Sequence, residues 1–109
     1  MSWLTSEIDA YHDGVPCPEA LAAALRGSEL LVPLVDGDLP MCVADRGLVW
    51  ICAFTSSRSL ARFATARGGG DDEWTYRRVR GTELTDLAYG VAVDLGGRRP
   101  MLFPAGCTS

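Results

Sequence analysis

The sequence predicts an α+β fold, with a mixed, mostly antiparallel sheet of five to six strands and three to four helices packed on it. Two observations lead to this prediction. The stretch from Glu29 to Phe54 contains three short apolar runs rich in Val, Ile, Trp and Phe, separated by Asp/Gly turn signals. Apolar residues at helical spacing precede and follow this stretch. At 109 residues, the chain is long enough to bury a single core without metals or disulfides.

Residues 2–13 are predicted to form a short N-terminal helix, because Leu4, Ile8 and Tyr11 recur at helical spacing before a Gly and a Pro. That apolar stripe is able to pack either on the domain or on a partner. The three residues are therefore candidate interface residues. We expect residues 1–16 to be a helical extension of the domain.

A second helix is expected over Glu19–Arg26, with Pro18 suited to its first turn and Gly27 to its end. Its buried stripe consists of Ala20, Leu21, Ala24 and Leu25. Residues 17–105 are expected to form the single domain, followed by a tail at 106–109.

The apolar runs Leu30–Val35, Met41–Ala44 and Leu48–Phe54 predict a three-stranded antiparallel meander. Pro33 has no N–H to donate to a ladder. The first strand is therefore expected to be an edge strand, or to be bulged at that residue.

After the meander the apolar spacing becomes helical again. Residues 55–57 (Thr-Ser-Ser) offer N-caps for a helix. Its apolar stripe consists of Leu60, Ala61, Phe63 and Ala64. Further on, Trp74–Arg80 alternates in a way that suits a partly exposed strand.

A third core helix is predicted to begin at Gly81 and to end at Gly90. Its apolar face consists of Leu84, Leu87 and Ala88. Val91–Leu95 and Met101–Phe103 are predicted to be the two final strands, with a Gly-Gly turn between them.

Charge and composition exclude several classes of protein. The net charge is −4: residues 1–54 carry eight acids and two arginines (net −6), and residues 55–109 carry six acids and eight arginines (net +2). This acidic balance argues against a nucleic-acid partner. All cations are Arg, and Lys, Asn and Gln are absent, which indicates a GC-rich bacterial source. The longest apolar run is too short to span a bilayer, and no signal-peptide pattern is present, so we expect a cytoplasmic protein with no membrane partner.

The four cysteines show no zinc-type spacing. Cys42 and Cys52 are expected to be small buried strand residues, kept reduced in the cytosol. A disulfide between them would require a turn register that puts them face to face.

The sequence signals for other metal, catalytic or phosphate-binding sites are weak. Asp36, Asp38 and the acidic residues 71–73 lie beside glycines, which favours turns over a cation site. His12, the single histidine, has no second His or Cys near it in the sequence. The chain has no Gly-x-Ser-x-Gly elbow and no P-loop. We therefore predict no catalytic, cofactor-binding or metal-binding residues, and no cofactor.

The basic strand that bears aromatics is the strongest interface candidate. Trp74, Tyr76, Arg77, Arg78 and Arg80 are of the types enriched in binding hot spots. Alternatively, one side of the strand packs its aromatics into the core while the arginines stay in solvent. The same mixture is able to stack nucleic-acid bases, but the acidic balance of the chain opposes that.

Several segments together resemble the SseB-like N-terminal domain, a bacterial family named for enhanced serine sensitivity. They are Glu19–Leu21 followed by Leu30–Val35, Ile51–Ser56 followed by Leu60–Phe63, then Gly81–Leu84, Gly90–Asp94 and Pro100–Pro104. The resemblance covers about residues 17–105 in the family's order. It implies an α+β fold and no catalytic residues, and longer relatives hint at a module that works with other proteins. The N-terminal helix, the turn at 94–97 and the missing second domain depart from the family's pattern.

We expect the chain to be a non-catalytic protein-interaction or accessory module of a bacterial cytosolic protein. Its partner is expected to be another protein or a second copy in a homodimer. The alternative is a small-molecule-binding or enzymatic domain with a site at the strand ends. That alternative needs a polar pocket built from several of Asp45, Arg46, Asp94 and Arg98.

Overall fold

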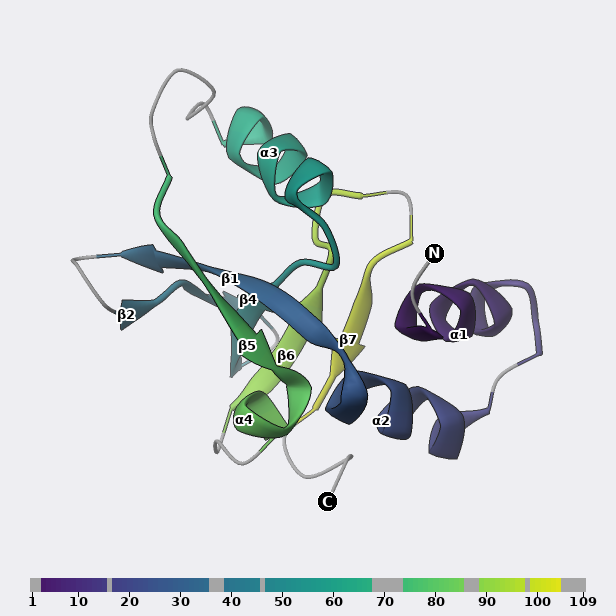
Figure 1. Ribbon diagram of the computed structural model, residues 1–109. Coiled ribbons are helices and arrows are strands. Elements are labelled where there is room, and N and C mark those ends of the chain that lie inside the picture. The colour runs from purple at the N-terminus through teal and green to yellow at the C-terminus, as the bar shows by residue number, and fades with distance from the viewer. Residues whose placement is uncertain are drawn as a thin grey trace.

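The structure is a computed structural model that describes residues 3–15, 17–35, 39–45, 47–67, 74–85, 89–97 and 99–104. Within these residues lie four helices and seven strands, so the predicted α+β class is confirmed (Figure 1). The predicted single sheet of five to six strands is wrong, because the strands form one sheet of three and one sheet of four.

The helices are α1 Trp3–His12, α2 Pro18–Gly27, α3 Ser57–Ala66 and α4 Gly81–Thr85. The strands are β1 Glu29–Val35, β2 Leu39–Pro40, β3 Cys42–Asp45, β4 Leu48–Ala53, β5 Tyr76–Arg80, β6 Gly90–Val93 and β7 Met101–Phe103. The sequence did not predict β2. Leu87 and Ala88 of the predicted third core helix lie outside the described residues. No helix within the described ranges is long and apolar enough to cross a membrane.

The predicted three-stranded meander is also wrong. β1 is the middle strand of the order β2-β1-β5, whereas β3 pairs with β4 in the order β3-β4-β6-β7. Within the second sheet, β4 and β6 run parallel and the other neighbours run antiparallel. Four consecutive residues of β1 are buried, on both faces of the strand, so its apolar pattern does not specify a neighbour. The neighbours that it takes are β5, from far along the chain, and the short strand β2.

A β-bridge between Leu31 and Phe54 joins the two sheets. The N–H of Leu31 donates to the carbonyl of Phe54, and the N–H of Phe54 donates to the carbonyl of Leu31, both at 2.8 Å. Because alternate residues of a strand face the same neighbour, Pro33 faces the same side as Leu31. On that side the N–H of Met41 donates to the Pro33 carbonyl at 2.8 Å. The proline therefore lies in a central strand rather than at an edge, at the point where the neighbour of β1 changes.

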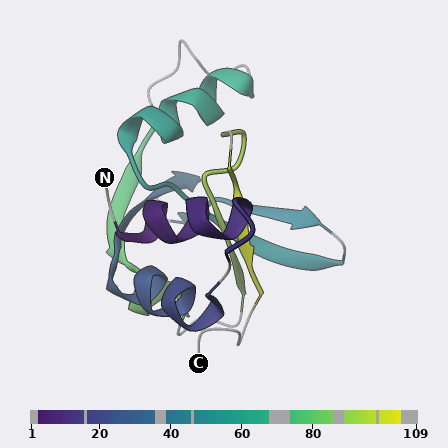
Figure 2. The same ribbon diagram turned by 90° about the vertical axis from the view of Figure 1, so that its right-hand side faces the viewer.

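The hydrophobic core has two parts. The larger part lies between the sheets and the helices α1, α2 and α4. The smaller part lies under α3, where Phe54 and Phe63 pack with ring centroids 5.1 Å apart. Figures 1 and 2 show α1 and α2 side by side on one flank of the sheets, with α3 separate from them.

The apolar stripe of α1 packs on its own domain. Leu4 is 0% exposed and Ile8 is 3% exposed, and both belong to the larger core. Of the two uses considered for this stripe, packing on the domain is the one observed. Leu4 and Ile8 are therefore core residues, which corrects their assignment as candidate interface residues.

The two strand cysteines do not face each other. The register places Cys42 opposite Ile51, so that Cys42 and Cys52 point to opposite faces of the sheet, and both are free thiols. Cys52 is buried as predicted, whereas Cys42 is exposed. Burial is the main reason why the pKa of Cys52 rises to about 11, so its thiol stays protonated and poorly reactive at neutral pH.

Gly81 marks a close approach between α2 and the junction of β5 and α4. Its N–H donates to the Ser28 carbonyl at 2.9 Å, and a Cβ at this position would collide with the backbone carbonyl of Leu25. Backbone atoms at the end of a helix cannot move aside as a flexible side chain would. The contact therefore requires glycine.

We predict that Gly81→Ala lowers the free energy of unfolding by about 2–3 kcal/mol, because the two backbones must separate. Gly27→Ala is a suitable control, since a Cβ there would lie 3.5 Å from the Trp3 ring, an ordinary contact. Urea denaturation of both variants measures the difference. Equal stability of the two variants would contradict the close approach.

Candidate functional site

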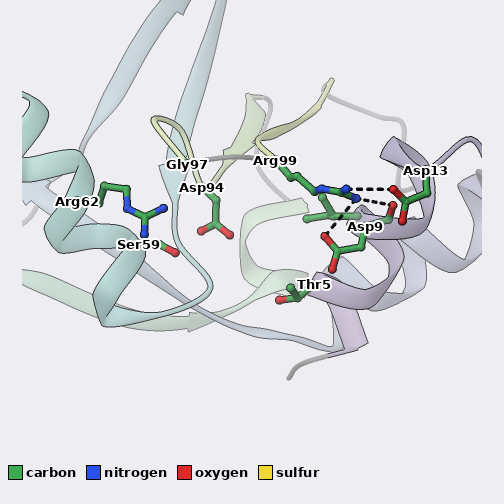
Figure 3. A pocket seen from close by; sticks show the side chains of 9 residues that line it. Thr5, Asp9, Asp13, Ser59, Arg62, Asp94, Gly97 and Arg99 are labelled. Atoms are coloured by element: carbon green, nitrogen blue, oxygen red, sulfur yellow. Dashed lines mark hydrogen bonds and ion pairs between the residues drawn. The ribbon is translucent and has the colours of Figure 1, made fainter.

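A polar cleft lies between α1, α3 and the connection from β6 to β7 (Figure 3). Its volume is about 570 Å³. It is lined by Thr5, Ile8, Asp9, Asp13, Ser59, Arg62, Asp94, Gly97 and Arg99. Asp94 directly follows β6, and α3 follows β4, so the cleft opens at the carboxyl ends of the two parallel strands.

Asp94 ties the ends of these two strands together. Its carboxylate accepts from the Thr55 N–H at 2.8 Å and from the Thr55 hydroxyl at 2.7 Å. Its own N–H donates to the Ala53 carbonyl at 2.9 Å. The φ angle of Asp94 is +55°, in the left-handed region that Asp tolerates better than most residues. The chain therefore turns sharply at this residue, and its carboxylate is hydrogen-bonded to Thr55, just beyond the end of β4.

Arg99 holds α1 to the opposite wall of the cleft. Its guanidinium lies 3.0 Å from the Asp13 carboxylate and 3.7 Å from that of Asp9, and it donates to the Asp9 carbonyl at 3.0 Å. The hydrogen bond to Asp13 is the main reason why the pKa of Arg99 is raised. On the same side, the His12 Nε2 donates to the Pro100 carbonyl at 3.1 Å. These groups are partly or largely exposed, so they fix the position of α1 more than they add stability.

The third wall is the start of α3. Ser56 is the N-cap, and its hydroxyl accepts from the Ser59 N–H at 3.1 Å. Ser59 and Arg62, three residues apart in the helix, both line the cleft, and Figure 3 shows them on the side opposite Arg99. Arg62 makes no ion pair within the part of the chain that the structure describes.

The charges in this cleft are mostly used within the protein. Arg99 is paired with two carboxylates, and each carboxylate oxygen of Asp94 accepts one hydrogen bond from Thr55. The Thr55 hydroxyl lies 2.7 Å from the Asp94 carboxylate, a distance typical of a nucleophile and its base, but Thr55 is not among the residues that line the cleft. Among the described residues, no three His, Cys, Asp or Glu side chains are grouped in a way that could hold a metal ion. What the cleft offers to a ligand is the cation of Arg62, hydroxyl groups and a polar rim.

Only part of this cleft was foreseen. Four residues were named for a site at the strand ends, and one of them, Asp94, lines the cleft. The other three lie outside the described residues: Arg46, Arg98 and the side chain of Asp45. The acidic residues 36, 38 and 71–73 also lie outside them. Sequence reasoning missed Arg99 and its two acids. Asp9 and Asp13 lie four residues apart on one helix face, a signal that could have indicated a cation partner.

The candidate interface strand β5 is the outer strand of the three-stranded sheet. Tyr76 is 43% exposed, and the three arginines of the strand are exposed as well. Arg78 pairs with Glu29 of β1 at 3.2 Å. Trp74, just before the strand, is half-buried and packs edge-on against Phe63, with ring centroids 6.1 Å apart. Trp74 therefore supports the core, while Tyr76 and the arginines face solvent.

Tyr11 is separate from this strand. It is 44% exposed and packs edge-on against His12, with ring centroids 5.6 Å apart. Figure 1 places α1 and β5 on different sides of the molecule. The eight candidate interface residues thus divide into two core residues, one half-buried aromatic, an isolated tyrosine and the group on β5.

Comparison with protein-family models, with curated proteins and with solved structures finds no match to this chain. The resemblance to the SseB-like domain stays a prediction.

We predict that Asp94→Ala lowers the free energy of unfolding by about 1–3 kcal/mol, because it removes two charge-assisted hydrogen bonds and leaves Ala in a left-handed conformation. Asp94→Asn keeps an acceptor and tolerates that conformation, so it is expected to lose less. Asp94→Gly relieves the backbone but not the lost bonds. If Gly restored full stability, the bonds to Thr55 would not be what holds the strand ends.

Proposed function

We propose that this chain is a non-catalytic protein-interaction module of a bacterial cytosolic protein, of the SseB-like kind, and that it binds its partner along the outer edge of β5. The observation that carries the proposal is a solvent-exposed outer strand with an aromatic residue and three arginines, in a sheet whose opposite strand β2 is only two residues long. An extended segment of another protein that adds to such an edge gains main-chain hydrogen bonds as well as side-chain contacts.

The main-chain pattern of β5 supports this use. Leu34 donates its N–H to the Thr75 carbonyl at 2.9 Å. This bond shows which residues of β5 turn their main-chain groups toward β1, because every second residue does so. Arg77 and Val79 then face β1, whereas the N–H and C=O groups of Tyr76 and Arg78 point outward. An added strand would pair with these outward groups, next to the exposed Tyr76 ring.

The charge of β5 indicates the chemistry of the partner. Three of its five residues are Arg, and Glu29 compensates one of them in part. Two such strands paired edge to edge would bring like charges together, which opposes a homodimer formed through β5. An acidic, extended segment fits better, either from another protein or from the acidic N-terminal half of a second copy.

We predict that Tyr76→Pro abolishes partner binding with the fold intact, because proline removes an outward N–H without touching the bonds to β1. Tyr76→Ala keeps the N–H and loses only the ring, so binding should weaken by about tenfold. The partner is first isolated by affinity capture with the unchanged chain, and its Kd for each variant is then measured. Equal binding by the proline and alanine variants, at the strength of the unchanged chain, would exclude the β5 edge.

A second candidate function has its own support. The polar cleft lies at the carboxyl ends of parallel strands, where open α/β sheets commonly bind small molecules. Arg62 has no ion-pair partner in the described part of the chain, and the Ser59 hydroxyl accepts a hydrogen bond from Ser56 while keeping its own proton to donate. Both groups line the cleft and favour a small ligand that carries an anionic group. That function is binding or enzymatic action at the strand ends.

For the second candidate, we predict that Arg62→Gln raises the Kd of a ligand bound in the cleft by about tenfold, because one charge-assisted hydrogen bond is lost. Arg58→Gln, on the same helix outside the cleft, is the matched control. Thermal-shift measurements against a panel of small carboxylates and phosphates identify such a ligand. If none raises the Tm, or if both variants respond alike, the cleft is not a binding site.

A further inference from the structure

The structure contains a second, chemically different cavity that neither proposed function uses. Its volume is about 430 Å³, and it lies between one face of the four-stranded sheet, the last turn of α3 and the β6–β7 connection. It is lined by Val43, Trp50, Phe63, Arg67, Leu95, Pro100 and Leu102. Six of these seven residues are apolar, and the one charged residue is Arg67.

The floor of the cavity is built by cross-strand pairs. Val43 of β3 lies opposite Trp50 of β4, and Trp50 lies beside Gly90 of β6. A Cβ at Gly90 would collide with the indole ring, so the glycine leaves room for the ring against the sheet. Trp50 is only 3% exposed, which makes the floor an ordered part of the fold.

The mouth of the cavity carries a cation. Arg67 is the C-cap residue of α3, and its guanidinium carbon lies 5.0 Å from the centroid of the Phe63 ring. The arginine is exposed, and within the described part of the chain it has no ion-pair partner. No acidic residue lines the cavity.

From this arrangement we propose that the cavity binds an amphipathic organic anion, with its apolar body against the partly buried side chains of Val43, Leu95 and Leu102 and its carboxylate at Arg67. Small-molecule sites are typically concave and mostly apolar, with a few placed polar groups, and their usual volumes include the value found here. A guanidinium at the mouth selects a carboxylate over a neutral or cationic head group. The polar cleft has the opposite character, since charged and hydroxyl side chains dominate its lining.

The test is a titration of the intact chain with decanoate, followed by calorimetry below the concentration at which decanoate forms micelles. We expect saturable binding of one decanoate per chain. The decyltrimethylammonium ion has the same tail and a cationic head, and we expect it to bind at least about tenfold more weakly. Arg67→Gln should lower the affinity for decanoate by about tenfold and abolish the preference for the anion over the cation. Arg58→Gln, an exposed change on the same helix outside the cavity, should leave both affinities unchanged.

Three results would overturn the proposal. The first is no saturable decanoate binding. The second is equal affinity for the two head groups in the unchanged chain, which would mean non-specific uptake by apolar surface. The third is a dimer in light scattering that Arg67→Gln leaves intact and that excludes decanoate, which would mean that a second copy covers this face. Because Arg67 is exposed, its substitution is not expected to unfold the protein, and circular dichroism of the variant checks this.

Discussion

The paired main-chain bonds between Leu31 and Phe54 are the constraint on which the rest of the structure depends. They form a bridge between the two sheets, at the point where β1 diverges from β4. Pro33 follows two residues later and has no N–H for a longer ladder on that side. The sheets therefore diverge. The two parts of the core lie on opposite faces of β1 and β4, because alternate residues of these strands belong to different parts.

That divergence also decides where polar groups meet. Once α3 is seated beyond the end of β4 and α1 is packed against α2, the connection after β6 lies between them. Asp94 joins this connection to Thr55 by a hydrogen bond, and Arg99 joins it to Asp13, next to α1, by an ion pair. The residues with the most conspicuous chemistry are thus occupied in holding three distant segments together. This is why a polar cleft of considerable volume presents few uncommitted groups to a ligand.

The three surfaces differ in what they are able to recognise. The β5 edge offers directed main-chain groups and positive charge, which suits an extended acidic chain. The polar cleft offers hydroxyl groups and the cation of Arg62. The cavity over Trp50 offers apolar area with one cation at its mouth. Because these chemistries differ, a different substitution is expected to abolish binding at each surface. The variants at Tyr76, Arg62 and Arg67 therefore distinguish the three surfaces.

The sequence by itself determined the α+β class, the positions of α1, α2 and α3, most of the buried stripes of α2 and α3, and the exposed character of β5. These features depend on residues within a few positions of one another, so local periodicity and turn signals suffice to predict them. Ala61, which was expected in the buried stripe of α3, is exposed. Only the tertiary structure decided that β1 pairs with β5 instead of β3, that Leu4 and Ile8 enter the core, and that Asp94 and Arg99 line one cleft. Those outcomes join segments far apart in the chain. An apolar strand buried on both faces accepts any matching neighbour, and the choice among neighbours is made by how the whole core packs.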